Sequence, residues 1–134
     1  MQVIERLPPI YSEILAAFPA IARMKPIFSW GSTIYNPHRI AIDDGLMAHE
    51  GVHAGQQGSN PEAWWRTYIA SPKFRLQEEL AAHRVEYQWR AKAPGMNRHQ
   101  RRALLVDVAK RLSSPMYGSM ISLSDARAAI AGGV

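Results

Sequence analysis

The order of apolar and polar residues along the 134-residue chain predicts helices for most of its length. Apolar side chains recur three and four positions apart, which places them on one face of a helix. Prolines, glycines and short polar residues divide these periodic stretches, because they cap helices or interrupt them. The pattern predicts helices over about 12–18, 43–58, 61–71, 73–91, 98–112 and 125–130.

A segment between residues 27 and 42 has a different pattern. It is rich in β-branched and aromatic residues and is broken by Gly31, Asn36 and Pro37. Such residues favour short strands that are separated by turns. We expect strands at 27–30, 33–35 and 39–42. The chain is therefore predicted to form a helix-rich α+β domain, with a small sheet ahead of the helix at 43–58.

Length and composition limit what this domain can be. A chain of 134 residues suits one domain, here 1–134, and can bury a core without disulfides or a metal. No cysteine is present, which excludes disulfides, thiolate metal ligands and a cysteine nucleophile. The first residues carry no apolar signal segment, and no apolar run is long enough to span a bilayer. We expect a cytoplasmic protein without membrane contact.

The formal net charge of +5 is unevenly distributed. Between Arg84 and Arg111 there are eight cations against two acids, Glu86 and Asp107. An acidic partner or a nucleic acid could bind such a basic stripe. A solvated helix face has the same composition, and no nucleic-acid motif accompanies this one.

The stretch "LMAHEGVHAGQQ" carries the clearest chemical signal. His49 and His53 are four residues apart, so their side chains leave the same face of a helix and can bind one metal ion. Glu50 is rotated away from them, beside the metal, where it can act as a general base. This is the physical basis of the HExxH motif.

A catalytic zinc needs a third protein ligand and one open position. In one large class of HExxH enzymes the third ligand is a histidine six residues after the second, but Ser59 occupies that position here. Cysteine is absent as well. The remaining option is a carboxylate from a later helix, and the segment "RLQEELAAHRVEYQWR" supplies Glu78 and Glu79.

At this point the sequence resembles the glutamate zincins, or gluzincins. These proteins pair HExxH with a glutamate on a downstream helix, often followed at the third position by alanine. Counted from Glu79, the third position is Ala82 and the next residue is His83, which fits this form. Counted from Glu78, the third position is also an alanine, Ala81, but the residue after it fits less well. The resemblance therefore implies that His49, His53 and Glu79 bind zinc, with Glu78 as the alternative.

Helix phase favours the other glutamate. Glu78 shares a stripe with Phe74 and Trp89 that we expect to be buried, whereas Glu79 shares a face with Arg75 and Glu86 that could be solvated. We prefer Glu79 because its motif match is closer.

The region from about Gly31 to Trp89 loosely resembles small HExxH proteins that are often encoded by phages. That resemblance implies that the strand before the zinc helix pairs with an extended substrate. Here the strand would be 33–35, or the one that contains Arg39, Ile40 and Ala41. His83 departs from the pattern, since larger gluzincins carry there an aspartate that orients a zinc histidine.

Two further residues are candidate donors to a developing oxyanion. His83 lies one helical turn after Glu79, and Tyr117 lies in a predicted loop. For both residues, packing is the more common role of such side chains.

These observations predict a zinc-dependent hydrolase, most simply a metallopeptidase with one zinc per chain. Water on the metal would attack a peptide or peptidoglycan amide, with Glu50 as the general base. Two alternatives stay open. One is a catalytically inactive zinc-binding module of a virion or another assembly. The other is a basic protein that binds nucleic acid through the Arg84–Arg111 stripe.

Overall fold

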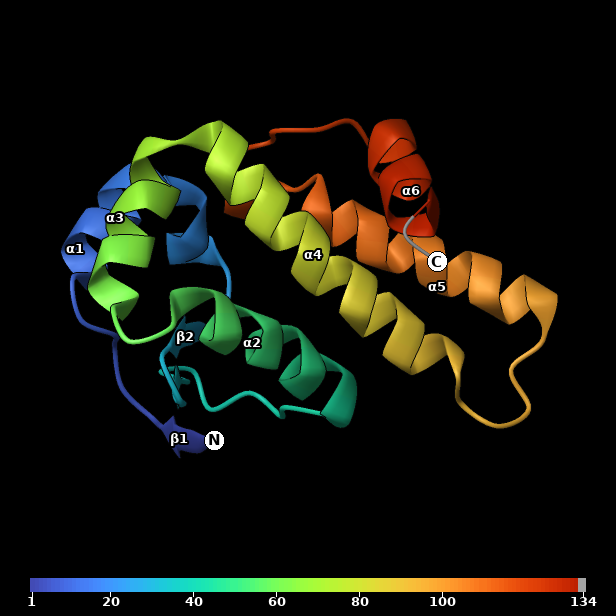
Figure 1. Ribbon diagram of the computed structural model, residues 1–134, viewed down its shortest axis with the longest axis horizontal. Coiled ribbons are helices and arrows are strands. Elements are labelled where there is room, and N and C mark those ends of the chain that lie inside the picture. Colours follow the sequence, from blue (N-terminus) through green and yellow to red (C-terminus); the bar gives the residue numbers. More distant parts are fainter. Residues whose placement is uncertain (133–134) are drawn as a thin grey trace.

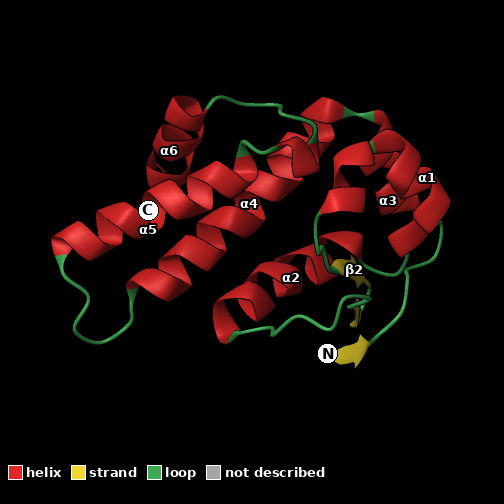
Figure 2. Cartoon of the chain, turned by 180° about the vertical axis from the view of Figure 1, so that it is seen from behind, coloured by secondary structure: helices red, strands yellow, loops and turns green. Residues whose placement is uncertain are grey.

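Helices form most of the structure, and one small sheet lies near the N-terminus (Figure 1; Figure 2). The structure is a computed structural model, and it describes residues 1–132. The α-helices are α1 (Tyr11–Ala17), α2 (Asp44–Gln57), α3 (Pro61–Ala70), α4 (Pro72–Ala91), α5 (Arg98–Leu112) and α6 (Leu123–Gly132). The strands are β1 (Gln2–Ile4), β2 (Phe28–Trp30) and β3 (Thr33–Tyr35), and short 3₁₀ helices span Pro19–Arg23 and Pro115–Tyr117. The predicted fold class, a helix-rich α+β domain with a sheet before the HExxH helix, is confirmed.

The sheet has the strand order β1-β3-β2. β2 and β3 form an antiparallel hairpin in which Ser29 is opposite Ile34, and Gly31 adopts a φ of +59° at the turn between them. That left-handed conformation suits glycine, which has no Cβ. β1 runs parallel to β3, with Val3 opposite Ile34. The two predicted strands of the hairpin are confirmed, whereas β1 was not predicted.

The predicted strand at 39–42 is wrong. The side chain of Asn36 accepts a hydrogen bond from the Ile40 backbone N–H (3.1 Å) and donates one to the Ile40 carbonyl (2.9 Å). Arg39 has a φ of +54°, outside the extended region. The Asn36 side chain thus takes up the N–H and C=O groups of Ile40, which a substrate strand would need for pairing. The hypothesis that Arg39, Ile40 and Ala41 bind an extended substrate therefore loses its basis. β3, the other candidate strand for substrate binding, already pairs with β1 on one side and β2 on the other, so it has no free edge.

Side-chain caps explain where the central helices begin. Asp43 accepts a hydrogen bond from the Leu46 N–H at the start of α2, and Asn60 and Ser71 play the same part for α3 and α4. Asn97 and Gln100 form a reciprocal capping box at the start of α5.

Two apolar clusters form the core, and α4 packs against both of them. The first joins α1, the first 3₁₀ helix, β2 and α3, and contains Ile14, Phe18, Ile21, Phe28, Trp64, Trp65 and Tyr68. The second joins α5 and α6 and contains Val108, Ala109, Leu112, Ala126 and Ile130. α2 packs along α4 (Figure 1). Gly45 permits this close approach, because a Cβ there would lie 2.6 Å from the Arg90 guanidinium carbon.

Among residues 1–132, no helix combines the length and the apolar character that crossing a membrane requires.

Candidate metal centre

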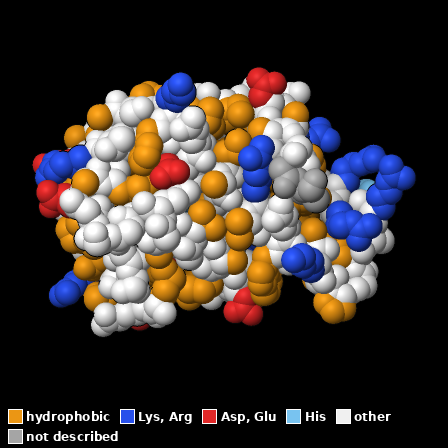
Figure 3. Space-filling view, in the orientation of Figure 1, with side chains coloured by type: hydrophobic (Ala, Val, Ile, Leu, Met, Phe, Trp, Pro, Cys, Tyr) orange, Lys and Arg blue, Asp and Glu red, His pale blue; other side chains and the backbone are white. Residues whose placement is uncertain are grey.

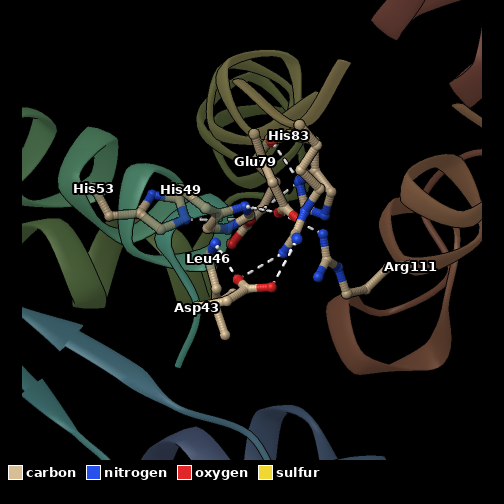
Figure 4. Close-up of polar contacts among 9 residues, drawn as sticks. Asp43, Leu46, His49, His53, Glu79, His83 and Arg111 are labelled. Atoms are coloured by element: carbon tan, nitrogen blue, oxygen red, sulfur yellow. Dashed lines mark hydrogen bonds and ion pairs between the residues drawn. The ribbon is translucent and has the colours of Figure 1, made fainter. Parts of the chain in front are cut away.

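The interface between α2 and α4 is filled by ionisable side chains. His49 and His53 from α2 are buried against Glu79 and His83 of α4 (Figure 4), and Glu50 of α2 is buried as well. The buried residues of α4 in this layer are Glu79, His83 and Glu86. Burying such groups is costly unless they pair with one another or with a metal. A dense cluster of this kind is typical of a functional site.

The two histidines of the HExxH motif converge on one carboxylate oxygen. Nε2 of His53 lies 3.2 Å from Oε1 of Glu79, and Nε2 of His49 lies 3.4 Å from the same atom. Ligand atoms around a tetrahedral zinc lie about 3.3 Å apart, because each bond is about 2.0–2.1 Å long. Each of these two distances to Glu79 matches that spacing. Among residues 1–132, the group of possible ligands whose atoms all lie within 4.8 Å of one another is His49, Glu79 and His83.

The second nitrogen of each imidazole donates to its own acceptor. Nδ1 of His49 lies 3.0 Å from Oε1 of Glu86. Nδ1 of His53 lies 2.8 Å from Oε1 of Gln56, whose amide nitrogen donates to the carbonyl of Glu78. Because both Nδ1 atoms have their own acceptors, each Nε2 atom is left to face Glu79. A protonated Nε2 donates to Oε1 of Glu79, and a neutral ring offers its Nε2 lone pair to a metal. Partners of this kind fix the orientation of metal-binding histidines.

The carboxylate of Glu79 is itself held in place. The Tyr68 hydroxyl donates to Oε2 at 2.5 Å, which leaves Oε1 for the histidine side of the site. Burial alone would raise the pKa of Glu79, but the charge of His53 and hydrogen bonds from both histidines hold it well below its usual value. Burial and the charge of Glu79 raise the pKa of Tyr68, so that the phenol keeps its proton.

Without a metal, protons must occupy the space between these groups. Burial would lower the pKa of His49, but hydrogen bonds with Glu79 and Glu86 outweigh it and raise that pKa to about 9. The pKa of His53 is also raised, because the charge and the hydrogen bond of Glu79 outweigh burial. A divalent cation could take the place of the protons that the Nε2 atoms of His49 and His53 share with Oε1 of Glu79.

The structure separates the two candidate glutamates. Glu79 is buried and faces the histidines, whereas Glu78 is half-buried and accepts a hydrogen bond from the Trp64 indole at 2.9 Å. The phase argument was wrong. The face of α4 that carries Arg75, Glu79 and Glu86 is the buried one. The stripe of Glu78 ends at solvent, since the side chain of Trp89 is 48% exposed.

His83 lies in the same cluster. Its ring packs against His49 with the centroids 4.6 Å apart, and it belongs with His49 and Glu79 to a group whose ligand atoms all lie within 4.8 Å of one another. Nδ1 donates to the Glu79 carbonyl at 2.6 Å, and Nε2 is buried with no partner among residues 1–132. Burial lowers the pKa of His83 to about 3, so the ring is neutral. This geometry leaves His83 no free proton to donate to an oxyanion.

Glu50 and Tyr117 line a cavity of about 60 Å³ beside the histidines. No hydrogen bond or ion pair joins the Glu50 carboxylate to another of the residues 1–132. Burial raises its pKa, which favours the uptake of a proton. Burial also raises the pKa of Tyr117 well above its usual value, so this phenol stays a donor. The volume exceeds the space that one water molecule needs.

The basic stripe divides into an internal part and an exposed part. Arg84 donates to the Ala129 carbonyl, and Arg90 and Arg111 both bond to Glu86. The exposed cations of the stripe are Lys92, Arg98, Arg101, Arg102 and Lys110. Lysine and arginine side chains gather at the end of the molecule where the α4–α5 loop and the start of α5 lie (Figure 3).

Three contacts of the site were not predicted from the sequence. They are the roles of Glu86 beside His49, Tyr68 beside Glu79 and Gln56 beside His53. One signal was present, because Glu79, His83 and Glu86 recur at spacings of four and three along α4. Their recurrence places three ionisable side chains on one helix face.

A scan against protein-family models, a search of curated proteins and a search of solved structures find no match to this chain. The functional argument therefore depends on the motif and on the geometry of the site.

Proposed function

We propose that this chain is a zinc-dependent hydrolase of the metallopeptidase type, with one zinc per chain. The observation that carries the proposal is the convergence of Nε2 of His49 and Nε2 of His53 on Oε1 of Glu79. Three nitrogen and oxygen ligands of this kind, with a fourth position left open, are typical of catalytic zinc. Each proposed ligand is also held by a hydrogen bond outside the metal site: His49 by Glu86, His53 by Gln56, and Glu79 by Tyr68. Such supporting contacts are typical of metal ligands.

Zinc bound there would supply a Lewis acid, which lowers the pKa of water and polarises a carbonyl group. Glu50 follows His49 and faces the cavity, where it accepts a proton from the attacking water and passes it to the leaving amine. Its raised pKa suits both transfers. Tyr117 lines the same cavity as a protonated phenol and donates to the developing oxyanion.

The substrate that best fits this site is an amide, as in a peptide or a peptidoglycan cross-link. The cavity walls opposite the ionisable groups are largely apolar and include Phe28, Trp65 and Met116. An apolar enclosure with a few convergent polar groups is the usual form of a small-molecule or side-chain pocket.

One observation favours a second candidate function. His83 stands within the compact group of possible ligands and has a free Nε2 atom. If His83 also bound the metal, four protein ligands would close the site, as in structural zinc sites. The chain would then be the inactive metal-binding module. The unpaired carboxylate of Glu50 in the cavity favours the hydrolase.

The test combines metal analysis with cleavage. Protein prepared with zinc should contain about one zinc per chain, and both His49→Ala and His53→Ala should lose it, as a three-ligand site requires. His99→Ala, which changes an exposed histidine on α5, is the control and should keep it. Cleavage of peptide or cell-wall substrates should stop with a chelator and return with added zinc. Protein that stays metal-free in excess zinc would contradict the proposal.

A further inference from the structure

A second cavity, of about 130 Å³, adjoins the metal centre. It shares the residues His49, Glu50 and Tyr117 with the first cavity, so the two meet at the proposed base. Its cationic lining residues are Lys25 and Arg111. We call this second cavity the Arg111 pocket. A group bound there would lie next to the bond that is cleaved at the metal centre.

The guanidinium of Arg111 has an N–H group that bonds to no other residue among 1–132. Its Nη2 atom bonds to Glu86, but its Nε atom is buried and has no partner among residues 1–132. An arginine carries five N–H donors in a planar fork, and a buried donor without an acceptor is costly. The Arg111 side chain as a whole is 32% exposed, so part of its fork is accessible to an incoming acceptor, and a carboxylate matches that fork best.

The charges around the pocket favour an anion. Glu86 is shared between Arg90 and Arg111, so this one carboxylate faces two guanidinium groups. Lys25 is exposed and lines the pocket. The acidic residue in the lining is Glu50, which the proposed function places at the reacting bond. An anionic group seated between Lys25 and Arg111 would therefore meet two cations.

We propose that the Arg111 pocket binds a carboxylate of the substrate, so that the substrates are amides with a free carboxylate close to the scissile bond. This inference rests on the proposed function, because the metal centre fixes which bond is near the pocket. The carboxylate could be the C-terminus of a peptide or an acidic side chain. Both sources present the same chemistry to Arg111 and Lys25, and the probes below distinguish them.

Binding of three malonyl hydroxamates to the zinc-loaded chain tests the inference. The hydroxamate anchors each probe at the metal. The first probe continues into glycine with a free carboxylate, the second into glycine amide, and the third into aspartic acid amide. We expect a carboxylate probe to bind about tenfold or more tightly than glycine amide, as a charged hydrogen-bonded pair warrants. Preference for the first or the third probe identifies the source of the carboxylate.

Two variants link the preference to the pocket. In Lys25→Met the carboxylate probes should lose most of their advantage, whereas glycine amide should bind as before. In Arg111→Met, which also removes a partner of Glu86, the measured quantity is the ratio between carboxylate and amide affinities, and this ratio should fall. Lys73→Met, which changes an exposed lysine on α4, is the matched control and should keep the full preference. Zinc content and circular dichroism are measured for each variant. Lys25→Met decides the question if Arg111→Met fails to fold, because Lys25 has no part in the Glu86 network.

The possible outcomes separate the two proposals. If zinc and all three probes bind, with equal affinity, the inference is overturned and the proposed function stands. If the carboxylate preference survives in Lys25→Met and in every folded Arg111 variant, the carboxylate binds elsewhere and the inference is again overturned. If the parent chain binds neither zinc nor any hydroxamate, the proposed function fails and this inference fails with it.

Discussion

Nδ1 of His49 donates a hydrogen bond to Oε1 of Glu86 across the α2–α4 interface, at 3.0 Å. Glu86 lies two helical turns beyond Glu79, so one face of α4 supplies both a candidate ligand and the support of another. Arg90 and Arg111 bond to Glu86 in turn. Burial would raise the pKa of Glu86, but hydrogen bonds from His49 and Arg111 and the charge of Arg111 outweigh it and hold that pKa well below its usual value, so Glu86 stays ionised.

Glu86→Ala should weaken zinc binding by about 10–100-fold, because His49 loses the partner that fixes its orientation. Competition with a chromophoric chelator measures the change. Glu62→Ala removes an exposed glutamate of α3 that pairs with Arg66 and should leave zinc affinity unchanged. Equal affinity in Glu86→Ala and the parent would show that this contact does not support a metal ligand.

The two neighbouring glutamates of α4 should respond in opposite ways. Glu79→Gln removes the charge on which both histidines converge, so we expect it to lose zinc. Glu78→Gln should keep zinc and lose no more than about 1 kcal/mol of stability, the usual value of one hydrogen bond, here from the Trp64 indole. Zinc content and urea unfolding measure the two effects. The reverse pattern of zinc loss would assign the ligand to Glu78.

Most of the fold could be predicted from the sequence because its signals are local. The helices follow from apolar periodicity and from caps such as Asp43 and Asn97 that act within three residues. β1 could not be predicted, because its three residues become a strand only by pairing with distant β3. The strand at 39–42 failed for a different reason, since the Asn36 side chain replaces a neighbouring strand.

The candidate site could be predicted only in part. The spacing of His49 and His53 places them on one helix face, and a motif match selected Glu79. Whether that face of α4 is buried depends on how α4 rotates against α2, which is a tertiary property. Helix phase therefore misplaced Glu79, and the partnership of Glu86 with His49 had no local signal.

His83→Asn tests whether the metal site is open or closed. The asparagine amide can replace Nδ1 in its hydrogen bond to the Glu79 carbonyl, but it places no atom at the Nε2 position. We expect this variant to keep about one zinc per chain, since three other ligands suffice for an open site. Elemental analysis decides the matter. Loss of zinc in a folded His83→Asn protein would favour the closed, structural site.

Stability of the metal-free protein should fall in alkali. The folded-state pKa of His49 is raised from 6.5 to about 9, so its protonation stabilises the fold fully below pH 6.5, and that contribution is lost as the pH rises through about 9. Urea unfolding in chelator, at about pH 6 and about pH 10, measures the loss. His49→Gln should reduce this dependence, whereas His99→Gln should not. With zinc bound, the dependence should reverse, because the ligands bind as neutral imidazoles.

Glu50→Gln separates metal binding from catalysis. Glutamine has nearly the shape and volume of glutamate but cannot accept a proton, and no metal ligand contact is lost. The variant should therefore bind zinc as the parent does, while hydrolysis falls by about 10²–10⁴-fold, the usual contribution of a positioned general base. Zinc content and turnover of the same peptide or cell-wall substrate are compared in the two proteins. Glu13→Gln, an exposed change on α1, should alter neither zinc content nor turnover.

If Glu50→Gln cleaves as fast as the parent, the role assigned to Glu50 is wrong. If the parent binds zinc but cleaves none of these substrates, the inactive metal-binding module becomes the better description.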